Sequence, residues 1–112
     1  MTYYKLAADG RTPIPVDDVI EWSKFFGDTE ARVVKQEDFP DEVRVSTVFL
    51  GIDHGFGFRR GATYQPVLWE TMIFNGPHDG WQDRATSYDD AIQCHKHAVH
   101  LVLSTPSHIH KP

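Results

Sequence analysis

Cysteine is almost absent from this sequence, which has a single thiol, Cys94, in 112 residues. One cysteine cannot form an internal disulfide, so the chain is not a disulfide-rich secreted domain. Long apolar runs are lacking too. No stretch approaches the roughly 20 apolar residues of a membrane-spanning helix, and Met1–Leu6 does not resemble the start of a signal peptide. We therefore expect a cytoplasmic protein with no membrane partner.

Positive charge is also scarce, with 11 lysines and arginines against 16 aspartates and glutamates and a net charge of −5. Proteins that bind duplexes neutralise phosphates with a basic face, so we expect no duplex nucleic acid partner. A few arginines that converge can still hold a small anion. The 40% content of hydrophobic residues is that of a globular protein and excludes a disordered chain.

Short segments rich in β-branched and aromatic residues, bounded by turn signals, predict the strands. The strongest is Val43–Ile52, where apolar residues on both faces indicate a central strand. Either this chain covers both faces, or helices cover one face and a partner subunit covers the other. We therefore expect a homo-oligomer, a dimer or larger. The predicted strands are Thr2–Leu6, Ala31–Lys35, Val43–Ile52, Val67–Phe74 and Trp81–Ala85.

Two helices are predicted. The first begins near Asp17 and ends at Gly27, and the second is capped by Thr86 or Ser87 and stops before Pro106. The second helix places seven residues on one apolar arc: Ala91, Cys94, His95, Ala98, Val99, Leu101 and Val102.

These elements predict one α+β domain over residues 1–106, followed by a flexible tail at residues 107–112. Its sheet would be mainly antiparallel, with about four to five strands, and both helices would pack on one face.

The segment Gly51–Gly61, GIDHGFGFRRG, predicts a long loop with the components of a nucleotide site. Its glycines let backbone N–H groups line an anion-binding concavity, and the guanidinium groups of Arg59 and Arg60 suit phosphate. The rings that would stack on a base are Phe56, Phe58 and Tyr64. The alternative is a solvated hairpin loop with exposed arginines.

Asp53 and His54 follow the strongest strand, where a carboxylate beside an imidazole can orient a base. Neighbours on a strand point to opposite faces, so a turn that ends the strand is the alternative.

Glu70 interrupts an otherwise apolar strand face, shared with Leu68, Met72 and Phe74. A charged group on a core-like face needs a partner, and Arg84 on the next strand is the candidate. The interpretations are a structural ion pair or a binding site.

His95 lies near the centre of the apolar arc of the last helix, as a hydrogen-bonded core residue or as a ligand contact. The seven histidines do not show the H-E-x-x-H spacing of a zinc site. We expect no catalytic set, no cofactor and no metal. A metal held by Asp53, His54 and His95 remains the enzymatic alternative.

Three segments together resemble a family of small phage and prophage proteins, mostly uncharacterised. They are VSTVFLGIDHGFG at Val45–Gly57, PVLWETMIFNGP at Pro66–Pro77, and a closing pattern of Arg84, Thr86, Ala91 and His95. The resemblance implies a role against host defence. One class of such phage proteins sequesters nucleotide immune signals, including cyclic ADP-ribose variants, without cleaving them.

The sequence therefore predicts a phage-type binding protein that holds a nucleotide-like small molecule. The predicted ligand contacts are Asp53, His54, Phe56, Phe58, Arg59, Arg60, Tyr64, Arg84 and His95. Two alternatives remain: a small metal-dependent hydrolase using Asp53, His54 and His95, and a protein–protein inhibitor of a host enzyme.

Overall fold

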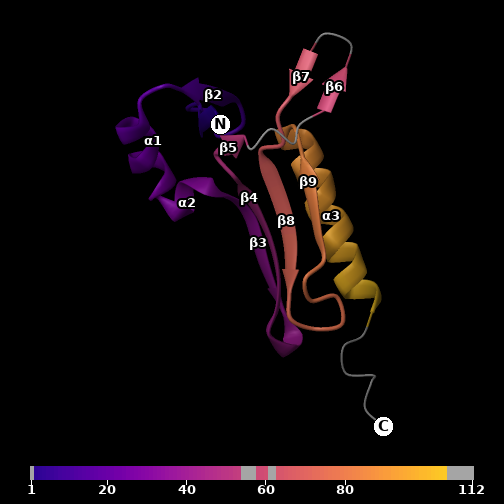
Figure 1. Cartoon of the computed structure of the whole chain (residues 1–112). Helices are drawn as coiled ribbons and strands as arrows, with labels where there is room; N and C mark the ends of the chain where they lie inside the picture. The colour runs from indigo at the N-terminus through magenta and orange to yellow at the C-terminus, as the bar shows by residue number, and fades with distance from the viewer. Residues whose placement is uncertain (1, 54–57, 61–62, 106–112) are drawn as a thin grey trace.

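The computed structural model describes residues 2–53, 58–60 and 63–105, with the backbone alone at 58–60. The fold is α+β, as predicted, but its strands form separate antiparallel sheets rather than one (Figure 1). The four-stranded sheet has the order β3-β4-β8-β9, the three-stranded sheet β2-β1-β5, and β6 pairs with β7. Among the described residues, no helix is both long enough and apolar enough to cross a membrane.

Strands β3 (Val33–Phe39), β4 (Val43–Phe49), β8 (Trp69–Phe74) and β9 (Gln82–Ala85) build the larger sheet. The smaller one contains β1 (Thr2–Leu6), β2 (Pro13–Val16) and β5 (Ile52–Asp53), and β6 (Phe58–Arg60) and β7 (Thr63–Gln65) form a hairpin. The helical elements are α1 (Val19–Phe26), α2 (Thr29–Arg32), the 3-10 turn η1 (Pro40–Glu42) and α3 (Tyr88–Ser104).

The predicted strand Val43–Ile52 is divided between two sheets at Gly51. The glycine has a φ of 77°, in the left-handed region, and its carbonyl accepts hydrogen bonds from Tyr4 N at 2.9 Å and Trp22 Nε1 at 3.0 Å. Ile52 then pairs with Tyr3 of β1 instead of continuing β4. The prediction of one continuous central strand was wrong because glycine alone permits this reversal at little steric cost.

The predicted strand Ala31–Lys35 begins as a helical turn. Asp28 caps α2 by accepting a hydrogen bond from Ala31 N at 3.2 Å, and β3 starts only at Val33. The two predicted helices are capped at the predicted position or next to it. Asp18, one residue after the predicted position, caps α1, and Ser87 caps α3 through Asp90 N at 3.1 Å.

The core lies between α3 and one face of the four-stranded sheet, which α3 contacts at β4, β8 and β9 (Figure 1). The predicted apolar arc of α3 faces this core, and Ala91, His95 and Ala98 are buried. In contrast, α1 packs mainly on β1 and β2 and reaches the core through Phe25, which meets Phe49 edge-on at 6.0 Å. The fully buried core side chains include Val45, Phe49, Leu68, Trp69, Ile73, Ala91 and Ala98.

Among the described residues, no helix covers the opposite face of this sheet, which we call the open face (Figure 1). On β8 the buried residues are Trp69, Thr71 and Ile73, whereas Glu70, Met72 and Phe74 lie on the open face. The prediction that Glu70 interrupts a core-like face was wrong. A strand with apolar residues on both faces does not reveal by its periodicity which face meets the helix.

Candidate functional site

The base of the β6–β7 hairpin gathers part of the predicted site. Asp53, at the end of β5, is only 8% exposed, and its Oδ1 accepts a hydrogen bond from the Tyr64 hydroxyl at 2.9 Å. Tyr4 on β1 lies nearby, and burial, followed by the charge of Asp53, raises the pKa of its phenol. Asp53 and Tyr64, two of the predicted ligand contacts, are therefore in direct contact.

The hairpin itself replaces the long loop that the glycines predicted. Its register places Arg59 opposite Tyr64 and Arg60 opposite Thr63. Arg59 is thus the cross-strand partner of the tyrosine that Asp53 anchors. Of the remaining predicted contacts, His54 and Phe56 lie outside the described residues, and Phe58 is opposite Gln65 in β6.

Glu70 and Arg84 form the predicted ion pair, with Arg84 Nε 3.0 Å from Glu70 Oε2. They are directly opposite each other on β8 and β9, on the open face. The side chain of Glu70 is 16% exposed and that of Arg84 is 49% exposed, so this is a surface pair and not a buried one.

We expect Glu70→Ala to lower the free energy of unfolding by at most about 1 kcal/mol, because Arg84 is half exposed and water screens the pair. Urea titration of both proteins measures the change. Arg44→Ala, which breaks the exposed Arg44–Asp38 pair, is the matched control and should behave alike. A loss above about 3 kcal/mol would instead mean that the pair behaves as a buried one.

His95 is at the centre of a buried hydrogen-bond chain that joins α3 to the sheet. Its Nδ1 lies 2.8 Å from Thr47 Oγ1, and its Nε2 lies 2.8 Å from Glu37 Oε1. Thr47 Oγ1 is in turn 2.6 Å from Thr71 Oγ1. His95 is 1% exposed, and both threonines are buried. The chain therefore satisfies polar groups that would otherwise lack partners in the core.

The hydrogen bonds of this buried chain can form with His95 in either of two protonation patterns. With a proton on Nε2 alone, His95 donates to Glu37 and accepts from the Thr47 hydroxyl. With both nitrogens protonated it donates in both directions. In either case both ring nitrogens are occupied, and neither is available to a ligand or a metal.

Glu37 was not among the predicted residues. The predicted strand ended at Lys35, whereas β3 continues to Phe39 and brings Glu37 opposite Val45, facing α3. The hydrogen bond to His95 is the largest cause that holds the pKa of the Glu37 carboxyl below its usual value, and Lys35 adds to it. Residues 33–39 read VVKQEDF, with no apolar–polar alternation that would have marked Glu37 as facing the core.

The predicted contacts do not form one cluster. Arg84 lies on the open face of the sheet, and His95 is buried beneath the opposite face. Arg84 and His95 are therefore separated from each other by the sheet, and the described part of the candidate site is the base of the hairpin. Within the residues that the structure describes, no three histidine, cysteine, aspartate or glutamate side chains are grouped to hold a metal ion.

Cys94 has the character of an unreactive thiol. Burial, and then the carboxylate of Asp83, raise its pKa to about 11. Its Sγ donates a weak hydrogen bond to Asp83 Oδ2 at 3.4 Å. A thiol with so high a pKa has little of the thiolate that nucleophilic catalysis requires.

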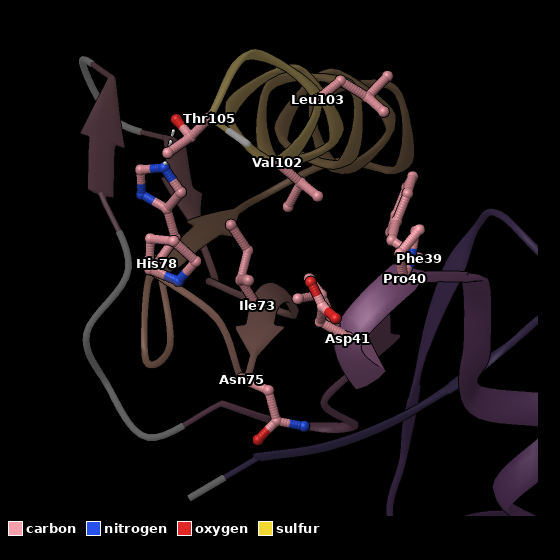
Figure 2. A pocket seen from close by; sticks show the side chains of 11 residues that line it. Phe39, Pro40, Asp41, Ile73, Asn75, His78, Val102, Leu103 and Thr105 are labelled. Atoms are coloured by element: carbon pink, nitrogen blue, oxygen red, sulfur yellow. Dashed lines mark hydrogen bonds between the residues drawn. The ribbon is translucent and has the colours of Figure 1, made fainter. Parts of the chain in front are cut away.

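A cavity that the sequence did not reveal lies at the far end of the molecule, between η1, the end of α3 and the segment after β8 (Figure 2). Its volume is about 280 Å³. Ile73 of β8 and Val102 of α3 point into it, and His78 Nε2 is 3.1 Å from Thr105 Oγ1 at its rim. The mainly apolar walls suit a small apolar group.

Comparison of the chain with protein-family models, with curated proteins and with solved structures finds no significant match.

Proposed function

We propose that this protein is a non-catalytic binding protein for a nucleotide-derived signal, held at the base of the β6–β7 hairpin. The observation that carries the proposal is the Tyr64–Asp53 hydrogen bond of 2.9 Å, with Arg59 directly opposite Tyr64 in the hairpin. A ring fixed by a carboxylate, with an arginine opposite it in the strand register, supplies residue types that a nucleotide contacts.

The proposed site divides its tasks among these groups. Arg59 and Arg60 neutralise phosphate charge, for which guanidinium groups provide paired donors. Tyr64, Phe56 and Phe58 supply rings on which a base stacks. Asp53 fixes the orientation of Tyr64, because a buried carboxylate that accepts the hydroxyl hydrogen restricts the tyrosine side chain.

Three features favour binding over catalysis. The hydroxyls of Thr47 and Thr71 are buried away from any substrate. The thiol of Cys94 has a pKa of about 11. His95, which the alternative hydrolase would use, has both ring nitrogens engaged by Thr47 and Glu37. The threonine hydroxyls and His95 lack access to a substrate, and the Cys94 thiol lacks the deprotonated form of a nucleophile.

The phage-type resemblance suggests the class of ligand. A cytoplasmic phage protein that counters host defence would sequester a cyclic ADP-ribose variant or a cyclic oligonucleotide. Such ligands combine a base with phosphates, which matches rings and guanidinium groups on one hairpin. The net charge of −5 does not oppose this, since local charges within a Debye length of about 8–10 Å dominate the field at the site.

Calorimetric titration with cyclic ADP-ribose variants and cyclic oligonucleotides tests the proposal. We expect micromolar or tighter binding of one ligand, weakened about 10- to 100-fold or more in Arg59→Ala/Arg60→Ala, because charged hydrogen bonds to phosphate are lost. Arg44→Ala, at the other end of the sheet, is the matched control and should bind like the parent. The proposal is wrong if no ligand binds below millimolar concentration, or if the double variant binds unchanged.

A further inference from the structure

Strand β3 is an edge of the four-stranded sheet in the part of the chain that the structure describes. In the order β3-β4-β8-β9, β4 is its one strand neighbour among the described residues. β3 spans Val33–Phe39, seven residues without a proline. The unpaired N–H and C=O groups of such an edge are a template for pairing with another chain.

The other described edges of the two larger sheets are less suited to pairing. β9 has four residues, and β5 has two. β2 contains Pro13 and Pro15, which have no backbone N–H to donate. α3 lies over β4, β8 and β9, so it does not cover the edge of β3 (Figure 1).

The charges of β3 are complementary to themselves in one antiparallel register. A two-fold axis at Gln36 places Lys35 opposite Glu37 of a second copy, and Glu37 opposite the second copy's Lys35. Moving the axis to residue 35 or 37 would place like charges directly opposite each other, which destabilises strand pairs. Lys35 and Glu37 are already 3.5 Å apart within one chain, with exposed or partly exposed side chains. The pairing would thus create an alternating cluster of four charges.

We propose that β3 pairs antiparallel with β3 of a second copy of this chain, with the two-fold axis at Gln36, to form one continuous eight-stranded sheet. Because this axis pairs residues 38 and 39 with 34 and 33, the bulge between Val33 and Lys35 limits the regular ladder to residues 35–37. Both α3 helices then lie on the same side of the joined sheet. The open faces, each with Val48, Met72 and the 41% exposed Phe74, become one wider surface.

Sedimentation equilibrium measures the first consequence. At tens of micromolar, the parent should have twice the chain mass of 12.8 kDa. Lys35→Glu should weaken the dimer about tenfold or more, since two attractive pairs become repulsive. Lys96→Glu makes the same charge change on the exposed surface of α3 and should leave the dimer unchanged.

Disulfide trapping tests the register. Opposite residues in an antiparallel pair have Cα atoms about 4.5–5.5 Å apart, within the span of about 4.4–6.8 Å that a disulfide bridges. In a Cys94→Ala background, Gln36→Cys should form the covalent dimer on mild oxidation. Asp38→Cys, two residues further along the same face, should not form a covalent dimer. In this register the two cysteines at position 38 lie about four residues apart along the ladder.

A mass of one chain at tens of micromolar overturns the proposal. A dimer whose dissociation constant is unchanged in Lys35→Glu overturns it too, and so does one that Asp38→Cys traps as readily as Gln36→Cys. These measurements need no ligand, so their outcome is independent of the proposed nucleotide site.

Discussion

Replacement of His95 by alanine is expected to lower the free energy of unfolding by about 3–5 kcal/mol. His95 is one of the largest fully buried side chains, and its removal leaves a cavity between α3 and the sheet. Thr47 would also lose the partner at 2.8 Å that its hydroxyl has in the buried chain. The loss of the His95 hydrogen bond should cost less free energy at Glu37, because its side chain is 36% exposed and water can replace the imidazole.

Urea or guanidinium titration followed by circular dichroism measures this change. His100→Ala is the matched control, because His100 is exposed on the same helix, and it should change the stability by no more than about 0.5 kcal/mol. A loss below about 1 kcal/mol in His95→Ala would contradict the buried chain as a source of stability. If the protein instead lost only ligand binding, His95 would belong to the site after all.

Replacement of Gly76 by alanine is expected to lower the free energy of unfolding by about 2–5 kcal/mol. Gly76 has a φ of 76°, which any residue with a Cβ adopts at a cost of about 1–2 kcal/mol. The added Cβ would also lie 2.7 Å from Cγ2 of Val43. Val43 is buried in the core beside Ile73 and Ala98, so it cannot move aside freely.

Gly80→Ala separates the two causes. Gly80 has a φ of 88°, but an added Cβ would meet nothing within 4 Å. It should therefore show the backbone term of about 1–2 kcal/mol alone. Thermal unfolding of both variants under the same conditions gives the comparison. Equal losses at the two glycines would show that the contact with Val43 is relieved, and that the turn after β8 is less rigid than its geometry indicates.

Much of the secondary structure followed from local chemistry. Ser87 caps α3 because a side-chain oxygen can accept from a free backbone N–H of the first turn. Asn75 and Gly76 form the predicted turn after β8, and both have positive φ, as this residue pair favours. The Glu70–Arg84 pair was predictable for a similar reason, since neighbouring antiparallel strands place opposite charges side by side.

The candidate site was predictable only in part. Asp53 and Tyr64 meet as the sequence suggested, because the chain folds back through a short hairpin within that segment. Arg84 and His95 do not join each other, since they lie on opposite sides of the four-stranded sheet. Their separation depends on which face of β8 is buried, and alternating apolar residues on both faces left that choice open.

The sequence by itself determined the α+β class, the helix caps, the turn at Asn75–Gly76 and the apolar arc of α3, because these depend on residues within a few positions of one another. Tertiary structure alone decided that Gly51 divides one strand between two sheets. It also decided that His95 meets Glu37 and Thr47, 58 and 48 residues away along the chain. Such contacts depend on how sheets and helix pack, and local propensity carries no information about a partner so distant in sequence.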